Sequence, residues 1–175
     1  MIELTDFKVE WECSFKNFKD AVMAAAKGLV KEVEHIGSAS IKNAKAKDIV
    51  DVQLGITTFE HADKISSTLN DLGFEYVSSI KQDHVPFHEF DYFEAGWGKR
   101  FFKGIYREQF YNVHVRILNS QNWIFAHNFK KYLSNNSNAK YAFMKFKERL
   151  ATSGVSREDY SLIKDSVIDL MSIQF

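Results

Sequence analysis

The sequence predicts an α+β protein in which a mixed or antiparallel sheet is flanked by helices and the C-terminal third is helical. Alternating apolar and polar residues, the pattern of half-buried strands, recur between residues 32 and 118. From Ser120 onward, apolar residues recur instead with helical spacing. Strands that come first and helices that come last favour an α+β domain over an alternating α/β fold.

The length and composition fit one domain, residues 1–175. A chain of this length, with 45% hydrophobic and 26% charged residues, has the composition of an ordinary globular protein with a sizeable core. The 16 Phe, 7 Tyr and 3 Trp residues are expected mainly in that core, because aromatic side chains bury large areas. The single cysteine, Cys13, excludes an intrachain disulfide.

The N-terminal half contains the expected strands and two helices. Helical spacing predicts a first helix over 14–30 with Ser14 as its N-cap. A capping-box pattern over 57–60 predicts a second helix that ends at Gly73. The segment 81–98, which contains the single proline, is expected to be a long loop. The predicted strands cover residues 32–36, 49–56, 74–80, 99–106 and 109–118.

The C-terminal third contains three predicted helices, near residues 121–134, 137–152 and 157–173. Ser156 precedes the last of these segments, and Asp159 follows three residues later. This pair approximates a capping box, with Asp in place of Glu.

A turn and the strand that follows it form the most informative segment. Gly37 lets the backbone approach a phosphate closely, and Ser38 adds a hydroxyl and an amide donor. Alternation over 49–56 places Asp51 and Gln53 on the face opposite the apolar residues, a face expected to open onto a cleft. Two carboxylates at this spacing hold divalent metal in nucleotidyl transfer, but Gln53 provides only a neutral carbonyl.

The strand predicted over 109–118 carries a second polar face. Asn112, His114 and Arg116 alternate with apolar residues, so this face is either solvent-exposed or lines a pocket. If the strand lies beside the one that carries Asp51, His114 is a candidate metal ligand or general base. Arg116 is then a candidate phosphate clamp.

Two further groups of polar residues are candidate components of a site. Among the basic residues near the turn, Lys47 and Arg100 are the candidates for neutralising phosphate charge. A second group lies in the expected loop and lacks the tight spacing of a metal motif, so a polar loop is favoured there over a metal site. Its members are His84, His88, Glu89 and Asp91.

Several motifs of this sequence resemble those of the GrpB-like family, a bacterial group assigned to the nucleotidyltransferase superfamily. The family motif E-H-I-G-S-[TA]-S, followed by K-P-[IV]-[IV]-D-[IV], is similar to residues 34–40 and 47–52. The resemblance covers nearly the whole chain. Its further matches are an early tryptophan ahead of the first helix at Trp11, R-x-F at 100–102, H-[LV]-H-V at 112–115, W-x5-F-[RK]-x-Y-L at 123–133, and Y-x3-K at 141–145.

The resemblance implies a nucleotidyltransferase-like core and a cleft lined by Ser38, Lys47, Asp51, Arg100 and His114. The chain departs from the family pattern at three places. Asp48 replaces a proline, Asn112 replaces the first histidine of the paired-histidine strand, and Lys130–Lys131 replaces an Arg-Asp pair. The loss of one histidine argues against a two-histidine metal site.

Two hypotheses for the function follow. The first is an enzyme that transfers a nucleotidyl or phosphoryl group from a nucleoside triphosphate to an acceptor, using Mg²⁺ held by Asp51, Gln53 and His114. In it, Asp51 and His114 are catalytic. The second is a non-catalytic module that binds a nucleotide or another small phosphorylated molecule. Both use the same set of residues for phosphate: Gly37, Ser38, Lys47, Arg100 and Arg116.

Composition limits the partners of this chain. The 23 basic and 23 acidic residues give a net charge of zero, which disfavours nucleic acid as a partner. No apolar run approaches the roughly 20 residues that span a bilayer, and the first residues lack a secretory signal pattern. The chain is therefore expected to be cytoplasmic and not to bind membranes, while its oligomeric state is left open.

Overall fold

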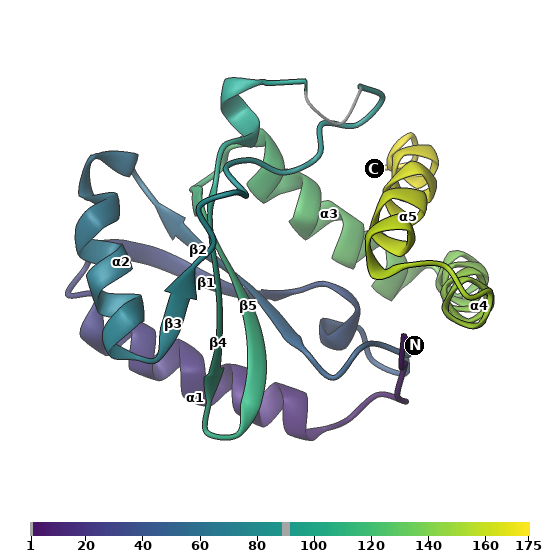
Figure 1. Ribbon diagram of the computed structural model, residues 1–175, viewed down its shortest axis with the longest axis horizontal. Helices are drawn as coiled ribbons and strands as arrows, with labels where there is room; N and C mark the ends of the chain where they lie inside the picture. Colours follow the sequence, from purple (N-terminus) through teal and green to yellow (C-terminus); the bar gives the residue numbers. More distant parts are fainter. Residues whose placement is uncertain (1, 89–91) are drawn as a thin grey trace.

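The computed structural model describes residues 2–88 and 92–175 of the chain (Figure 1). Within these residues, five strands form one sheet in the order β1-β2-β5-β4-β3. β2 pairs with β5 in parallel, and the other pairs are antiparallel. The predicted α+β class with a mixed sheet is thus confirmed. The strands are β1 (Val30–Ile36), β2 (Val50–Ile56), β3 (Phe74–Tyr76), β4 (Arg100–Tyr106) and β5 (Gln109–Ile117).

One face of the sheet is apolar and is covered by the two N-terminal helices, α1 and α2. The inward residues of β2 are Val50, Val52 and Leu54, and each is fully buried. They pack in one core cluster with Phe18 of α1 and Ile65 of α2. The alternation seen in the sequence therefore predicts the covered face of β2 correctly. These helices are α1 (Glu10–Ala25) and α2 (Ala62–Asp71), the latter preceded by the 3₁₀ helix η2 (Phe59–His61).

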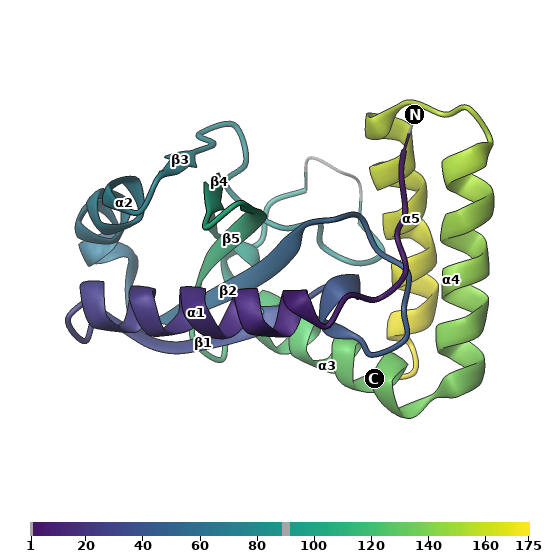
Figure 2. The same cartoon turned by 90° about the horizontal axis from the view of Figure 1, so that it is seen from below.

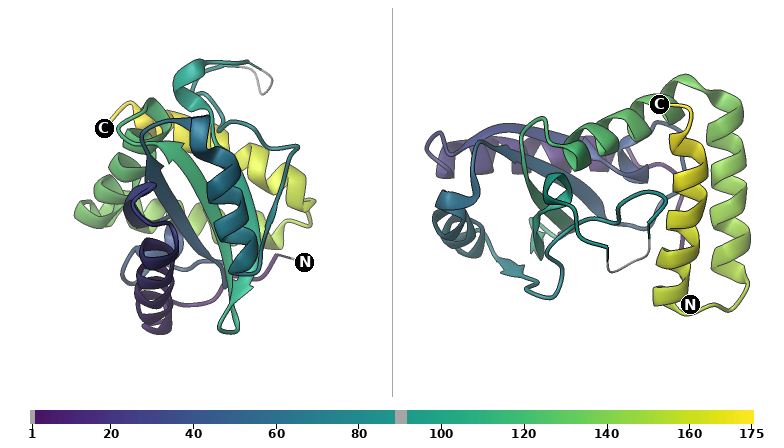
Figure 3. Two further views of the ribbon diagram at one scale, coloured as in Figure 1. Left: turned by 90° about the vertical axis from the view of Figure 1, so that its left-hand side faces the viewer. Right: turned by 90° about the horizontal axis from the view of Figure 1, so that it is seen from above.

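The remaining helices lie toward the opposite face and one end of the sheet. α4 and α5 run side by side at the end of the molecule away from α2 (Figures 2 and 3). A second core cluster joins them and α3 to residues 41–44, which belong to the connection between β1 and β2. These helices are α3 (Gln121–Asn135), α4 (Ser137–Thr152) and α5 (Arg157–Ser172), and the short 3₁₀ helices are η1 (Ser38–Ser40) and η3 (Ala95–Trp97).

Three predicted boundaries were wrong. The first helix ends at Ala25 rather than at residue 30, and Val30 already belongs to β1. The first helix begins at Glu10, so Ser14 is not its N-cap and Trp11 lies inside the helix rather than ahead of it. A tertiary contact explains the earlier start of the helix: Trp11 is fully buried, and its indole N–H donates a hydrogen bond to Asp48 over 2.7 Å. The strand predicted over 74–80 ends at Tyr76.

The predicted C-terminal helices are confirmed with small shifts at their ends. Ser156 caps α5 as predicted, because its hydroxyl accepts a hydrogen bond from the backbone N–H of Asp159 over 3.0 Å. Among the described helices, none combines the length and apolar composition that crossing a membrane requires.

Candidate functional site

The candidate site lies on the polar face of the central strands β2 and β5. Their parallel register places Asp51 opposite Asn112 and Gln53 opposite His114. The Asn112 amide donates a hydrogen bond to Asp51 Oδ1 over 2.8 Å. The two polar faces noted in the sequence therefore form one surface.

The turn after β1 is held tightly against Asp51. Gly37 has a positive φ of 69°, and a Cβ atom at this position would lie 2.6 Å from Asp51 Oδ2. Both facts require glycine, since a side chain would strain the backbone and collide with the carboxylate. The Ser40 hydroxyl donates to the Gly37 carbonyl over 2.7 Å and fixes the turn. Ser38 is thereby held next to Asp51.

Gln53 is fully buried and connects two charged side chains. Its amide oxygen accepts a hydrogen bond from Arg116 Nη1 over 2.6 Å, and its amide nitrogen donates to Glu34 Oε2 over 2.8 Å. The expected exposure of Gln53 to a cleft is therefore wrong, whereas Asp51 is half-buried. The position where a second metal-binding carboxylate was expected is occupied by this neutral bridge.

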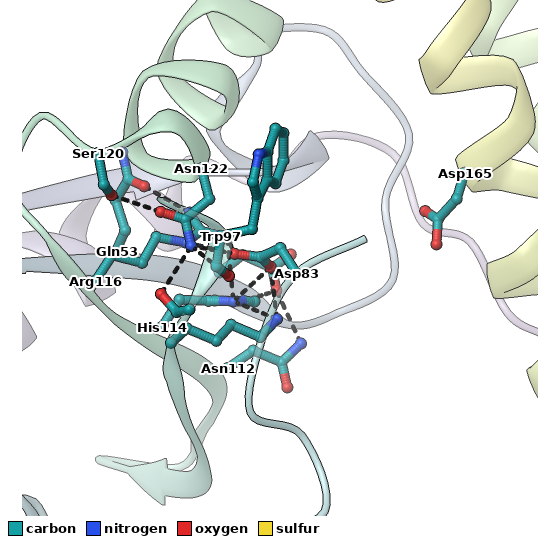
Figure 4. Close-up of polar contacts among 12 residues, drawn as sticks. Gln53, Asp83, Trp97, Asn112, His114, Arg116, Ser120, Asn122 and Asp165 are labelled. Atoms are coloured by element: carbon teal, nitrogen blue, oxygen red, sulfur yellow. Dashed lines mark hydrogen bonds and ion pairs between the residues drawn. The ribbon is translucent and has the colours of Figure 1, made fainter. Parts of the chain in front are cut away.

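Asp83, in the loop between β3 and β4, is the centre of a cluster that sequence reasoning missed. It forms an ion pair with Lys99 over 2.6 Å and accepts hydrogen bonds from Arg116 and Asn122 over 2.9 Å each (Figure 4). Burial alone would raise the pKa of Asp83, but the charges of Arg116 and Lys99 outweigh it and hold that pKa well below its usual range. We call these four residues the Asp83 cluster.

His114 lies between the Asp83 cluster and Asp51. Its Nδ1 faces Lys99 Nζ at 3.4 Å and Arg116 Nη2 at 3.5 Å, while its Nε2 lies 4.0 Å from Asp51 Oδ1. Burial and the charge of Lys99 lower the pKa of His114 to about 4, so the ring is neutral at pH 7. The two groups nearest Nδ1, on Lys99 and Arg116, can only donate, and the Asp83 carboxylate lies further away at 3.9 Å, so Nδ1 accepts and the proton resides on Nε2.

The predicted donor set for Mg²⁺ does not fit the observed geometry. The Gln53 oxygen is bound to Arg116, and the His114 nitrogen that faces Asp51 carries a proton. Asp51 is then the one anionic ligand of the three. Across residues 2–88 and 92–175, no three His, Cys, Asp or Glu side chains are grouped so as to hold a metal ion.

Lys147 contacts Ser38, and the charges of Lys147, Lys47 and Lys164 act on one another and on Asp51; we call these three residues the lysine group. Lys147, on α4, is only 3% exposed. Its amine donates to the Ser38 hydroxyl over 2.8 Å and to the Lys45 carbonyl over 2.6 Å. Burial, followed by the charge of Lys164, lowers the pKa of Lys147 to about 7. The same two causes lower the pKa of Lys47.

The lysine group is poorly neutralised. Lys47 Nζ lies over the Tyr160 ring, 4.5 Å from its centroid. In the part of the chain that the structure describes, no carboxylate lies within ion-pair distance of Lys47 or Lys147, and Lys164 contacts only Asp165, at 3.7 Å. The cations of the Asp83 cluster differ, because each has a carboxylate partner.

Two predicted phosphate-binding residues are engaged elsewhere. Arg100 pairs with Val115 in the sheet and so points to the apolar face. There its guanidinium lies 5.5 Å from the centroid of the Tyr76 ring and 3.5 Å from Asp63. Arg116 is buried between Asp83 and Gln53. Of the predicted phosphate ligands, the structure therefore brings Gly37, Ser38 and Lys47 together around Asp51, but not Arg100 or Arg116.

The histidine-rich segment of the loop contacts α5. His84 Nε2 lies 2.9 Å from Asp169, whose carboxylate also accepts a hydrogen bond from the Phe87 backbone N–H over 3.1 Å. His88 stacks on Tyr92. Glu89 and Asp91 lie outside the described residues. The described part of this segment thus connects the loop to the helical third of the chain.

Comparison with known proteins identifies the family. A family model described as GrpB protein matches residues 1–172. The chain belongs to the GrpB family. A solved structure, that of the conserved protein GrpB from Enterococcus faecalis, superimposes with a TM-score of 0.77 at 21% sequence identity, over 98% of each chain. This likeness shows a shared GrpB fold, and among curated proteins no match was found.

Proposed function

We propose that this GrpB protein binds a small phosphorylated molecule, such as a nucleotide, at the lysine group beside the Gly37–Ser38 turn. The observation that carries the proposal is Lys147. A buried ammonium group that contacts only neutral oxygens is unfavourable, since a buried charge requires a counter-charge. A phosphate beside Lys147 would supply that charge.

The charges around the turn support a phosphate rather than a cation. Lys99 and Arg116 share the carboxylate of Asp83, so each is held in an ion pair, although one net positive charge remains on these three residues. The charge of Asp51 acts on both Lys47 and Lys147, and that of Glu148 acts on Lys147, but among the described residues neither carboxylate lies within ion-pair distance of either lysine. The lysines without an ion pair among the described residues therefore lie on the Ser38 side of Asp51, where the hydroxyl and the turn amides can also donate to phosphate oxygens.

Nucleotidyl or phosphoryl transfer is the second candidate, and the position of Asp51 beside the Gly-Ser turn favours it. Transfer chemistry requires charge stabilisation at both the attacking and leaving oxygens. In this chain the second carboxylate position is the Gln53–Arg116 bridge. The binding function is therefore better supported than the reaction.

Isothermal titration calorimetry with ATP, AMP and inorganic phosphate tests the proposal. Lys47→Met and Lys147→Met are each expected to weaken binding about tenfold or more, because one charge-assisted hydrogen bond contributes about 1.5–3 kcal/mol. Lys131→Met, at an exposed position on α3, is the matched control and should bind like the parent protein. Absence of binding for all three ligands would refute the proposal.

The same titrations separate the two candidate functions. For a binding module, EDTA leaves the affinity unchanged, and Asp51→Asn retains or tightens binding because it removes a negative charge near the phosphate. For a transferase, binding depends on Mg²⁺, and Asp51→Asn abolishes that dependence.

A further inference from the structure

We infer that Lys147 is a nucleophilic amine that forms an imine with the carbonyl group of a phosphorylated aldehyde or ketone. The inference rests on the proposed function, because the lysine group and the Gly37–Ser38 turn bind the phosphate of the ligand and so bring its carbonyl group to Lys147. It adds a covalent role for one residue and narrows the ligand class to molecules that carry both a phosphate and a carbonyl.

The position of Lys147 favours this role. Its amine is fixed by two neutral acceptors, the Ser38 hydroxyl at 2.8 Å and the Lys45 carbonyl at 2.6 Å. Among the described residues, the amine has no carboxylate partner that would hold it as an ammonium ion. Lys145, two residues away on α4, differs because it pairs with Glu148 over 2.9 Å.

The environment of Lys147 also supplies the neutral form that a nucleophile needs. Burial and the neighbouring charges of Lys164 and Lys47 lower its pKa to about 7, against the opposing charges of Asp51 and Glu148. About half of the Lys147 amines are then neutral at pH 7, compared with roughly one in a few thousand for an ordinary lysine. Desolvation and a cationic neighbour are the established means of activating an amine.

The reaction is a condensation without an oxidant or reductant. The lone pair of the neutral amine attacks the carbonyl carbon, forming a C–N bond as the carbonyl π bond breaks. The carbonyl oxygen then leaves as water, taking both protons of the amine. The product is an imine between Lys147 and the ligand, with the phosphate still bound at the turn.

Pyridoxal phosphate is a suitable probe, because it carries a phosphate and an aldehyde. The full chain is incubated with it at pH 7, reduced with borohydride to fix any imine, and digested for peptide mass spectrometry. Labelling at Lys147 is expected to exceed labelling at Lys145 by about tenfold or more, because Lys145 is exposed, pairs with Glu148 and lies outside the phosphate site. Pyridoxal, which lacks the phosphate, should label Lys147 much less.

Two variants make the test specific. Lys147→Arg keeps a positive charge but has no amine nucleophile, so it should lose the imine absorbance and the label. Lys145→Arg, the matched control, should be labelled like the parent protein. Circular dichroism confirms that both variants are folded.

The outcomes separate this inference from the proposed function. Phosphate binding without a label at Lys147, or a label at Lys47 in its place, would overturn the imine and leave the phosphate site standing. Equal labelling of Lys147 by pyridoxal would overturn the requirement for phosphate. If the parent protein neither binds phosphate nor is labelled at Lys147, both the proposed function and the imine are rejected.

Discussion

At the residue scale, Gln53 connects a carboxylate to a guanidinium inside the sheet. Its amide nitrogen donates a hydrogen bond to Glu34, and its amide oxygen accepts one from Arg116. A carboxylate at this position could accept from Arg116 but could not donate to Glu34. The sequence shows a glutamine where a metal-binding carboxylate was expected. It does not show what the amide contacts, because both partners come from strands that join β2 only in the folded protein.

Gln53→Glu is therefore expected to lower the free energy of unfolding by about 2–4 kcal/mol at pH 7, since two carboxylates would face each other inside the sheet. The double variant Glu34→Gln/Gln53→Glu exchanges donor and acceptor and should recover at least half of the loss. Urea denaturation followed by circular dichroism measures both. A double variant no more stable than the single one would contradict the bridge.

At the scale of elements, strand alternation was a better guide than helix capping. It identified the buried face of β2 and the polar face of β5, because the alternation of apolar and polar residues along a strand depends only on which side of the sheet is covered. The first helix start was missed because the contact between Trp11 and Asp48 extends α1 beyond its local pattern. The role of Asp83 was missed for a similar reason, since a loop has no periodicity that reports its tertiary contacts.

The loop that carries Asp83 should be strongly coupled to the sheet. Asp83→Asn leaves Lys99 and Arg116 buried without their carboxylate and is expected to cost about 3–5 kcal/mol of unfolding free energy. Thermal and urea denaturation measure the change in the free energy of unfolding. Asp63→Asn is the matched control, because its side chain is 97% exposed and lies 3.5 Å from Arg100, so its effect should stay within about 0.5 kcal/mol. Similar losses in both variants would argue against the Asp83 cluster.

At the scale of the whole molecule, the site forms where the sheet meets the C-terminal helices. The sheet provides Asp51 and the Gly37–Ser38 turn, whereas α4 and α5 provide Lys147 and Lys164. The residues around the turn were predictable because they form a compact segment of sequence. The two helical lysines were not, since they lie about 100 residues further on and are brought in by the core around residues 41–44.

The cost of burying Lys147 predicts a pH dependence of stability. Its pKa is lowered to about 7 in the folded protein, so between pH 7 and the ordinary lysine pKa the unfolded chain binds more protons and stability rises with pH. From pH 7 to pH 9 the free energy of unfolding of the parent protein should rise by about 2 kcal/mol more than that of Lys147→Met. Urea titrations at both pH values, with Lys131→Met as control, measure the difference. Identical pH slopes for the parent protein and Lys147→Met would contradict the lowered pKa.

The parallel pairing of β2 with β5 also bears on how the chain is synthesised. Asp51 and Asn112 are 61 residues apart, so β2 emerges from the ribosome long before its partner. Until β5 is complete, one edge of β2 carries unpaired backbone groups, and such edges attract other strands. A truncated chain that ends before residue 109 is therefore expected to aggregate rather than fold as a smaller unit.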